Sequence, residues 1–401
     1  MHILHIEKML LLASGVTSYV RALTKVQRQR GHAVSMFGCG GPDNDRLPPF
    51  RDFARERSPL ALWRMIESVR AANLLERFLR GLGRVDVAHV HNIYHHLTPS
   101  ILPVLARRRI PIVMTVHDYR LACPTKHFLR PDGVCMRCLP HRLYHAASPR
   151  CAGLAGAALA AETLVQRFLR RYVRWVDLFL CPSAFMAEVL ARVSVPSSKL
   201  AVTANTIDRL DLPAGVARAA RRLLYAGRVA PEKGTDLMLD LADRVADTEV
   251  VIAGGGGMLA ELKEAARRRK VGNVTFTGPL DRGELAREFA AAAVVVIPSR
   301  CIENSPQTML EAMACGRAVV AADHAPLRQW VTDRETGRLF APGSAASLAA
   351  VVGEVLADPA GREAMERRAA EVVARRHDTA AVAERIERLY LEARRRCALR
   401  W

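Results

Sequence analysis

Short apolar runs alternate with helix-forming stretches along almost the whole of this 401-residue chain. Strands that are buried on both faces appear as continuous apolar runs, and their alternation with helices is typical of a parallel sheet wound with helices. We expect strands at 2–6, 33–37, 85–90, 111–116, 178–181 and 200–203, and in the second half at 222–226, 249–253, 274–277, 294–297 and 318–321. The sequence therefore predicts an α/β fold with two such sheets.

The chain is long enough for two domains of ordinary size. Helices are expected at 17–30, 62–81 and 99–109, and Gly31 ends the first of them. A boundary at 205–215 gives an N-terminal domain at 1–207, with an irregular insertion at 119–155, and a second domain at 208–375. Both are expected to be Rossmann-like and to face one another across a crevice, where ligands bind at the carboxyl ends of parallel strands.

One segment of the second half places two carboxylates around the start of a helix. A buried strand at 294–297 leads into a loop, and Pro306 then opens a helix with Asn304 or Ser305 as its N-cap. Glu303 is expected in the loop and Glu311 on the helix, among apolar neighbours. A buried carboxylate is costly unless something hydrogen-bonds it. Ligand binding and an internal cap or ion pair are both open for Glu311.

A second loop of the same half combines two cations with a helix start. The strand at 222–226 ends at Gly227, and Arg228 and Lys233 flank a loop that leads into a helix capped by Thr235 or Asp236. A guanidinium binds phosphate bidentately, an ammonium adds a point charge, and a helix N-terminus adds amide donors. Alone, such a loop also fits a solvated basic turn. The two loops together, each at the carboxyl end of a strand, favour a phosphate site.

These two loops resemble those of the family-four retaining glycosyltransferases of the GT-B fold, also called group 1 glycosyl transferases. The specific matches are the pair Glu303 and Glu311, with the run that continues to residue 320, and the loop 227–234. Weaker matches lie at 253–257, 276–278 and 336–343, and in the first half at 31–34, 90–92, 115–118 and 205–208. The chain departs from the family's glycine-containing patterns at Ser14-Gly15, at Asn304-Ser305 and at Asn205-Thr206.

The resemblance implies transfer of a sugar from a nucleotide sugar to an acceptor hydroxyl, with retention of the anomeric configuration. Arg228 and Lys233 are expected to hold the diphosphate and to stabilise its developing charge. They would replace a divalent metal, so no cofactor is expected for catalysis. Glu311 would hydrogen-bond the ribose, and Glu303 the donor hexose.

Further roles follow from the same resemblance. The amides at Asn304 and Ser305 would orient the donor sugar, and Gly15 would lie against the phosphate. His117 is expected to contact the donor sugar, with Asp118 on the acceptor side. The catalytic candidates are therefore Glu303, His117, Arg228 and Lys233. A helix at 376–401 is expected to pack back on the N-terminal domain.

The basic charge of the chain is concentrated in its first half. Residues 1–205 carry 29 Lys and Arg against 13 Asp and Glu, a net charge of +16, whereas the rest carry 30 against 27, a net of +3. Sparse aromatics and the lack of a nucleic-acid-binding motif argue against DNA or RNA. An anionic membrane surface fits better, because each basic residue near one contributes roughly 1 kcal/mol. The segment 167–175 mixes arginines with aromatics, and either an interfacial helix or a core helix with a solvated face accounts for it.

Four cysteines cluster in the irregular insertion: Cys123, Cys135, Cys138 and Cys151. The pair at 135 and 138 has the spacing of a metal knuckle, and two more thiolates would complete a tetrahedral structural zinc site. His127, His141 and His145 are possible substitutes. Zinc and ordinary buried thiols are equally open.

The resulting hypothesis is a retaining hexosyltransferase acting on a lipid-linked or polysaccharide acceptor in bacterial cell-surface glycan biosynthesis. A strand that begins at residue 2 argues against a cleavable signal peptide, and no apolar run spans a membrane. We expect a cytoplasmic protein, peripheral on the inner face of the membrane. The alternatives are a sugar-nucleotide epimerase of the same fold and a non-catalytic sugar-nucleotide-binding subunit.

Overall fold

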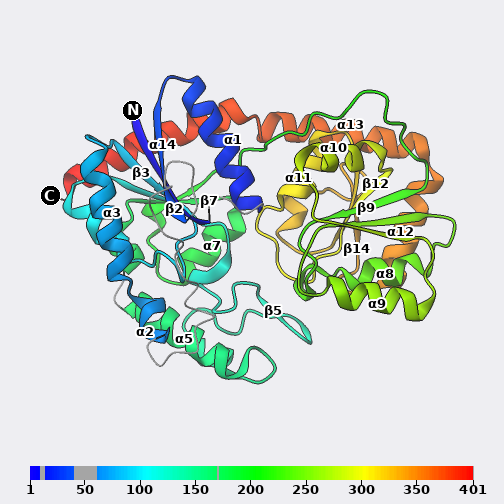
Figure 1. The fold of residues 1–401 in the computed structure, drawn as a ribbon, viewed down its shortest axis with the longest axis horizontal. Coiled ribbons are helices and arrows are strands. Elements are labelled where there is room, and N and C mark those ends of the chain that lie inside the picture. The colour runs from blue at the N-terminus through cyan, green and yellow to red at the C-terminus, as the bar shows by residue number, and fades with distance from the viewer. Residues whose placement is uncertain (10–13, 40–60, 169–170, 401) are drawn as a thin grey trace. The chain divides into compact units, whose positions relative to one another are not determined.

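The computed structural model describes residues 1–9, 14–39, 61–168 and 171–400 (Figure 1). The chain divides into two compact units. Unit 1 comprises Met1–Pro131, Cys135–Thr206 and Thr379–Trp401, and unit 2 comprises Asp132–Val134 and Ile207–Asp378. In the described residues each unit contains a six-stranded parallel sheet.

The sheet of unit 1 has the order β2-β1-β3-β4-β7-β8. Its strands are β1 (His2–Met9), β2 (Ala33–Cys39), β3 (Val87–Val90), β4 (Ile112–Thr115), β7 (Leu178–Cys181) and β8 (Leu200–Val202). The helices are α1 (Gly15–Gln29), α2 (Ala61–Ile66), α3 (Val69–Gly81), α4 (Ile101–Arg107), α5 (Gly153–Phe168), α6 (Arg171–Trp175), α7 (Ala184–Arg192) and α14 (Thr379–Leu399). The short turns η3 (Tyr119–Leu121), η4 (Leu143–Ala147) and η5 (Ser197–Lys199) and the strand β5 (Leu129–Arg130) complete the elements of unit 1. Strand β5 forms a two-stranded sheet with β6 (Gly133–Val134), which belongs to the segment Asp132–Val134.

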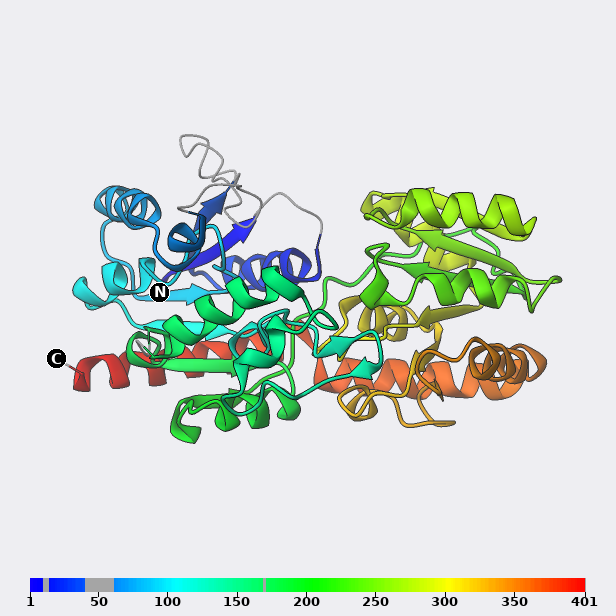
Figure 2. The same ribbon diagram turned by 90° about the horizontal axis from the view of Figure 1, so that it is seen from below.

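The last helix of the chain belongs to the core of unit 1. Helix α14 packs against α1 and β4, and Figure 2 shows it in red beside the strands of this unit. Its Ile386 and Tyr390 are fully buried in the same apolar cluster as Ile3, Val87 and Val113 from three central strands. Residues from the two ends of the sequence therefore share one core.

The sheet of unit 2 has the order β11-β10-β9-β12-β13-β14. Its strands are β9 (Arg222–Ala226), β10 (Glu249–Ala253), β11 (Val274–Gly278), β12 (Val294–Ile297), β13 (Ala318–Ala322) and β14 (Arg338–Phe340). The helices are α8 (Asp236–Ala242), α9 (Leu259–Arg269), α10 (Arg282–Ala291), α11 (Gln307–Ala314), α12 (Ala345–Ala357) and α13 (Pro359–Arg376), and the short turns are η6 (Pro231–Lys233) and η7 (Leu327–Gln329).

Two apolar clusters cover the two faces of this sheet. Leu223 and Val294 contribute to a cluster with α8 and α12. Their neighbours Leu224 and Val295 point to the other face and join α10, α11 and α13. Because successive side chains of a strand alternate between the faces, burial of both faces accounts for the continuous apolar runs in the sequence. This arrangement is the α/β fold that the sequence predicts.

Several boundaries differ from the expected ones. The helix expected at 62–81 is two helices, because Ser68 caps α3 by accepting a hydrogen bond from the amide of Ala71. The final helix, expected from residue 376, begins at Thr379 as α14, and β14 is a short strand that we did not predict. The segment 167–175 is not one continuous described helix: α5 ends at Phe168 and α6 begins at Arg171, while Arg170 lies outside the described residues.

The caps expected in unit 2 are wrong in detail. Helix α11 begins at Gln307, and its N-cap is Pro306, which makes no side-chain cap bond. Proline fixes the backbone for a helix start, so neither Asn304 nor Ser305 is needed as a cap. At α8, Thr235 occupies the N-cap position but its side chain does not bond the helix.

None of the helices in the described part of the chain is both long and apolar enough to cross a membrane.

Candidate functional site

The strand order of unit 2 reverses between β9 and β12, which are neighbours in the sheet. Ligands in open α/β sheets bind at the carboxyl ends of the strands at such a switch point. The loop that follows β9 carries Arg228 and Lys233, and the loop that follows β12 carries Glu303. The topology therefore brings the two motifs of the sequence together at this position.

Lys233 and Glu303 form the centre of this site. The Nζ atom of Lys233 lies 2.6 Å from Oε1 of Glu303, although the two residues are 70 positions apart. The hydroxyl of Ser299 donates to the same carboxylate oxygen at 2.6 Å. Burial lowers the pKa of Lys233, but the Glu303 carboxylate more than offsets that effect and the net pKa lies above its ordinary value. Lys233 is therefore a cation in this site.

Arg228 stands at the outer side of the same loop. Its guanidinium is half exposed and pairs with Glu232 one turn further along. The carbonyl oxygen of Glu232 accepts hydrogen bonds from the amides of Arg300 and Cys301, at 3.0 and 3.1 Å. The loops after β9 and β12 are thus joined by their backbones. Arg228 retains an exposed, charged guanidinium with which to bind an anion.

Glycines allow three loops to approach one another closely. A Cβ atom on Gly234 would lie 2.1 Å from the carbonyl oxygen of Pro298, and one on Gly254 would lie 1.8 Å from that of Gly227. Both glycines also have positive φ, +63° and +141°, which disfavours other residues. The glycine run after β10 therefore packs against the loop after β9, and Gly234 packs against the loop after β12.

Several polar side chains around this site are buried without a partner. The hydroxyls of Thr235 and Ser305, and both amide atoms of Gln307, make no hydrogen bond to the described residues. Native proteins rarely leave buried polar groups unsatisfied, so such groups call for an explanation. A bound polar ligand is the simplest one. The sequence motifs include Ser305, and Thr235 was expected only as a helix cap. We did not identify Gln307 or Ser299 from the sequence; a glutamine in the first turn of a largely apolar helix is the signal that was available.

Glu311 lies on α11, where it is almost fully buried. Burial raises its pKa to about 7, the guanidinium of Arg282 pulls it back, and the Asp208 carboxylate raises it further. Arg282 itself pairs with Asp208 at 3.2 Å. Glu311 is therefore poised to titrate near neutral pH. The local environment supplies an attractive cation, but no hydrogen bond from the described residues fixes the carboxylate.

In unit 1, His117 is half-buried and ends a chain of imidazoles whose other members are buried. The Nε2 atom of His117 lies 3.1 Å from Nδ1 of His91, and Nε2 of His91 lies 3.0 Å from Nδ1 of His5. The Nε2 atom of His5 is 2.8 Å from the side-chain oxygen of Gln27. Because that oxygen can only accept, each histidine donates through Nε2–H and accepts at Nδ1. The chain fixes one neutral tautomer for all three.

A second branch of this network reaches α14. The amide nitrogen of Gln27 donates to the hydroxyl of Tyr390, which lies 2.7 Å from Nδ1 of His89. Nε2 of His89 in turn lies 2.7 Å from the hydroxyl of Thr115. Burial lowers the pKa of His5 to about 4 and that of His117 to about 3, and it lowers those of His89 and His91 well below their ordinary range. The four imidazoles are neutral.

Three of these histidines also converge closely enough for a metal ion. The ligand atoms of His5, His89 and His91 lie within 4.8 Å of one another, and they form the only such group found among the described residues. However, all six of their ring nitrogens already have hydrogen-bond partners. A metal would have to displace these bonds. We therefore interpret the cluster as a hydrogen-bonded network.

The other residues predicted in unit 1 have simpler surroundings. Gly15 is the first residue of α1, and Ser14 caps that helix by accepting from the amide of Thr17. The side chain of Asp118 accepts from the amide of Arg120 and caps η3. Asp118 therefore has a structural partner besides any acceptor. Asn205 is buried, and the hydroxyl of Thr206 donates to the carbonyl oxygen of Tyr19.

The four cysteines predicted as zinc ligands are free thiols near one another. Cys123 and Cys138 are buried, and Cys135 and Cys151 are half-buried. Burial, followed by the three neighbouring thiols, raises the pKa of Cys138 to about 12. The four sulfur atoms do not form one of the tightly convergent groups found among the described residues. The zinc site stays a prediction.

Comparison with known proteins places both halves of the chain. Residues 215–372 match the family described as "Glycosyl transferases group 1", and residues 13–209 match "Glycosyltransferase Family 4". A phosphatidyl-myo-inositol mannosyltransferase of Mycobacterium leprae is 30% identical over 386 residues, which are 94% of this chain and 92% of that protein. The chain belongs to the group 1, family-four glycosyltransferases. A glycogen synthase of Mycobacterium tuberculosis is 30% identical to this glycosyltransferase over 295 residues, 71% of the chain and 70% of the relative.

Solved structures show that the glycosyltransferase has the GT-B fold. Anabaena Alr3699/HepE, crystallised with UDP and glucose, superimposes with a TM-score of 0.70 at 18% identity and covers 98% of this chain and 100% of its own. The sucrose-phosphate synthase of Thermosynechococcus elongatus gives a TM-score of 0.73 at 20% identity, covering 98% of each chain. These likenesses confirm the predicted fold.

Proposed function

We propose that this glycosyltransferase moves a sugar from a nucleoside diphosphate sugar to an acceptor hydroxyl with retention of the anomeric configuration. The observation that carries the proposal is the convergence of Arg228, Lys233 and Glu303 at the β9–β12 switch point. The buried, unpartnered atoms of Thr235, Ser305 and Gln307 support a polar ligand there. UDP occupies the related Anabaena protein, so UDP sugars are the first donors to test.

The two cations, Arg228 and Lys233, would provide most of the electrostatic stabilisation of the leaving diphosphate. As the bond between sugar and phosphate breaks, negative charge develops on the diphosphate, and Arg228 and Lys233 would stabilise it. In other phosphoryl and glycosyl chemistry a divalent metal does this. We therefore propose that the reaction needs no metal.

The carboxylates and histidine would orient the donor. Glu311 would accept hydrogen bonds from the ribose hydroxyls, and Glu303 from the hexose. The amides at Asn304 and Ser305 would help to place that sugar, with Gly15 against the phosphate. His117 would contact the donor sugar in the tautomer that its chain of imidazoles fixes. Asp118 stays a candidate on the acceptor side.

A donor panel tests the proposal. The melting temperature of the whole protein is measured with UDP, GDP, ADP and dTDP sugars, because a ligand that binds only the folded state at a hundred times its Kd stabilises it by about 2.7 kcal/mol. We expect one nucleotide to stand out, and the product anomer, read by NMR, to match that of the donor. If no nucleotide sugar shifts the melting temperature, the donor-site assignment is wrong.

We also propose that the acceptor is lipid-linked and that the protein docks on an anionic membrane from the cytoplasmic side. The net charge of +16 in residues 1–205 supports this. Two relatives support a lipid substrate, since both are phosphatidyl-myo-inositol mannosyltransferases. Co-sedimentation with anionic vesicles is expected at low salt and should fade at high salt, because the screening length is about 8 Å at physiological ionic strength. Indifference to anionic vesicles at low salt favours a soluble glycan acceptor instead.

A structural zinc ion in the cysteine-rich insertion is a further part of the proposal. Four neighbouring thiols suit the tetrahedral sulfur coordination of zinc, and metal binding would order a segment with little core of its own. The ion would have no part in the transfer reaction.

A further inference from the structure

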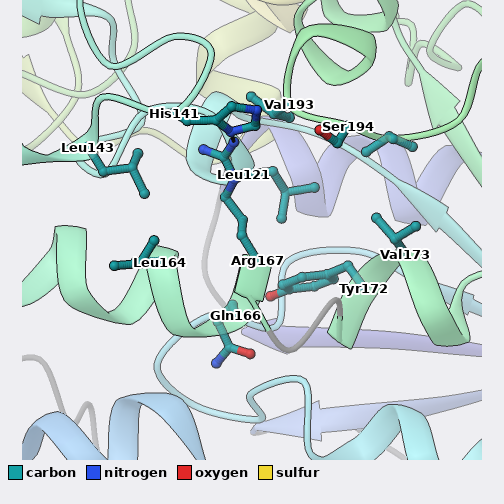
Figure 3. A pocket seen from close by; sticks show the side chains of 11 residues that line it. Leu121, His141, Leu143, Leu164, Gln166, Arg167, Tyr172, Val173, Val193 and Ser194 are labelled. Carbon is teal, nitrogen blue, oxygen red and sulfur yellow. Dashed lines mark hydrogen bonds between the residues drawn. The ribbon is translucent and has the colours of Figure 1, made fainter.

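A cavity of about 280 Å³ lies in unit 1, between the cysteine-rich insertion and helices α5 and α6 (Figure 3). Its volume is just below the range of roughly 300–1,000 Å³ that is typical of small-molecule sites. Six aliphatic side chains from five separate segments line it: Leu121, Leu143, Leu164, Val173, Val193 and Val195. The cavity is therefore suited to hydrocarbon rather than to a sugar, which would need many hydrogen-bond partners.

One cation projects into this apolar space. Figure 3 shows Arg167 reaching from α5 toward His141 past the side chain of Leu121. Its Nη2 atom donates to the carbonyl oxygen of Pro140 at 2.6 Å and contacts the ring of His141. Nη1 is buried and has no hydrogen-bond partner among the described residues. No carboxylate of these residues forms an ion pair with the guanidinium of Arg167; the nearby Arg120 and Arg171 pair with Glu162 and Glu67 instead. Burial lowers the pKa of Arg167.

A half-buried guanidinium that is held by a carbonyl oxygen and an imidazole, with no carboxylate beside it, favours an anion. Charges removed from water are stabilised when a counter-charge and hydrogen bonds replace the lost solvent. A phosphate matches the donor geometry of arginine particularly well. The hydroxyl of Tyr172 and the side-chain oxygen of Gln166, which also line the cavity, are likewise buried without partners.

Four large apolar side chains are exposed on α5 and on two elements packed against it. Helix α5 packs against α2 and η4, and these three elements carry Trp63, Tyr144, Leu154 and Leu164, which are 61%, 67%, 92% and 56% exposed. Leu164 is both exposed and part of the cavity wall. Exposed apolar side chains gathered on a basic unit are typical of a surface that meets a membrane.

We propose that the cavity binds the hydrocarbon chain of an anionic membrane lipid, with the lipid phosphate held by Arg167. This inference rests on the membrane docking proposed above and names the site at which a lipid enters the protein. It is independent of the donor site in unit 2. The aliphatic walls account for the chain, the unpaired guanidinium for the phosphate, and the exposed apolar side chains for the approach to the bilayer.

The test uses the full-length protein and dodecyl phosphate below its micellar concentration, with excess UDP present to block any phosphate site for the donor. Affinity is measured by calorimetry for the wild type, Arg167→Gln and Val173→Phe, which fills the cavity from its wall. Arg174→Gln and Val202→Phe are matched controls, because Arg174 is exposed beside Trp175 and Val202 is exposed on β8. Dodecanol and inorganic phosphate are probed separately.

We expect Arg167→Gln and Val173→Phe each to weaken dodecyl phosphate binding at least tenfold, and the two controls to change it less than twofold. Dodecanol should bind at least tenfold more weakly than dodecyl phosphate, and millimolar phosphate should not compete. Equal binding by Val173→Phe, or equal binding of dodecanol and dodecyl phosphate, overturns the proposal. The donor panel is run on the same variants. A normal response to nucleotide sugars together with lost lipid binding shows that the lipid site is separate from the donor site. Lipid binding without any response to nucleotide sugars refutes only the proposed donor.

Discussion

At the scale of single residues, burial separates side chains that look alike in the sequence. Glu303 has Lys233 and Ser299 as hydrogen-bond partners, each at 2.6 Å. Glu311 is almost fully buried, and burial raises its pKa to about 7 although the Arg282 guanidinium lowers it. We propose that the first carboxylate exchanges its lysine for a sugar hydroxyl when the donor binds. The second changes charge near neutral pH.

Removal of either cation of the loop after β9, Arg228 or Lys233, is expected to slow the reaction. Lys233→Ala and Arg228→Ala should each lower kcat by on the order of a hundredfold or more, because each deletes a charge-assisted contact to the leaving diphosphate. Lys263→Ala, at an exposed lysine of α9, is the matched control. Steady-state kinetics with folded variants decides the matter: near-normal turnover in both would refute the phosphate role.

The two glutamates should respond differently to pH and to substitution. Glu311 with a pKa of about 7 must lose a proton to accept two ribose hydroxyls, so donor affinity should rise from pH 6 to 8, at most tenfold per pH unit. Glu311→Gln should weaken binding and abolish this rise, whereas Glu303→Gln should mainly lower turnover. Calorimetry is best done with the nucleotide sugar, because the terminal phosphate of a free nucleotide titrates near pH 6. A pH profile that Glu311→Gln leaves unchanged would contradict the assignment.

Part of this chemistry could be predicted from the sequence, and part could not. Lys233 and Glu303 could be found because each lies just after an apolar strand. Their direct contact depends on β9 and β12 being neighbours, which the order of elements along the chain does not reveal. The histidine network is hidden for the same reason, since β1, β3 and β4 meet only in the folded sheet.

At the scale of elements, the strands of unit 2 were the most predictable part. Arg222–Ala226, Glu249–Ala253 and Val294–Ile297 have the expected bounds, because strands buried on both faces are apolar throughout. Helix ends depend on one local hydrogen bond and are harder to predict, as Ser68 shows. The loops cannot be predicted in this way, because glycines set their close packing through backbone geometry rather than through side-chain pattern.

The glycine run provides a sharp test of this loop packing. Gly254→Ala should lower both stability and donor affinity, because a Cβ there would lie 1.8 Å from the carbonyl oxygen of Gly227 at a φ of +141°. Gly257→Ala is the matched control: the space around it is open and its φ is unstrained. We expect the control to change neither property measurably. Thermal melts with and without donor, compared between the two variants, provide the measurement, and equal behaviour would show that the close approach is dispensable.

The cysteine-rich insertion carries its own prediction. If Cys123, Cys135, Cys138 and Cys151 bind zinc, the protein purified without chelator should contain about one equivalent of metal, and removal of the metal should expose the insertion to proteolysis. Cys181→Ser, at a buried thiol of β7 outside the insertion, should keep the metal, whereas Cys138→Ser should lose it. Elemental analysis that finds no zinc, together with four rapidly titrating thiols, would exclude the site.

At the scale of the whole molecule, unit 1 depends on both ends of the sequence. Tyr390 of α14 completes the hydrogen-bonded network of Gln27 and His89. Arg30, at the carboxyl end of α1, forms an ion pair with Glu387 of α14 at 2.9 Å. Arg400 pairs with Asp177 at 2.9 Å. The histidines of this network are neutral in the folded protein, so the free energy of unfolding should depend on pH.

Stability should fall when the pH is lowered from 7 to 5. His5, His89, His91 and His117 have folded-state pKa values below 6.5, so below that pH the unfolded chain binds protons that the folded chain does not. Each contributes about 1.4 kcal/mol per pH unit. Glu311 acts in the opposite direction, because its folded pKa is raised and the folded chain therefore binds one extra proton between the unfolded pKa and pH 7. The free energy of unfolding should then fall by a net of about 4 kcal/mol per pH unit. Urea unfolding at pH 7, 6 and 5 measures the change, and a midpoint that stays constant or rises would contradict a neutral network.

The return of α14 to unit 1 also sets an order of events during synthesis. On the ribosome, residues 1–206 emerge long before α14, the helix that completes their core. The continuous segment 207–378 of unit 2 is synthesised before α14, so unit 2 has all of this segment while unit 1 is still incomplete. Until α14 emerges, the nascent unit 1 has an open apolar groove beside α1 and β4. Premature termination after residue 378 would leave a finished second unit joined to a first unit whose core is missing a wall. Expression of the first unit alone accordingly calls for a fusion that supplies residues 379–400 in cis.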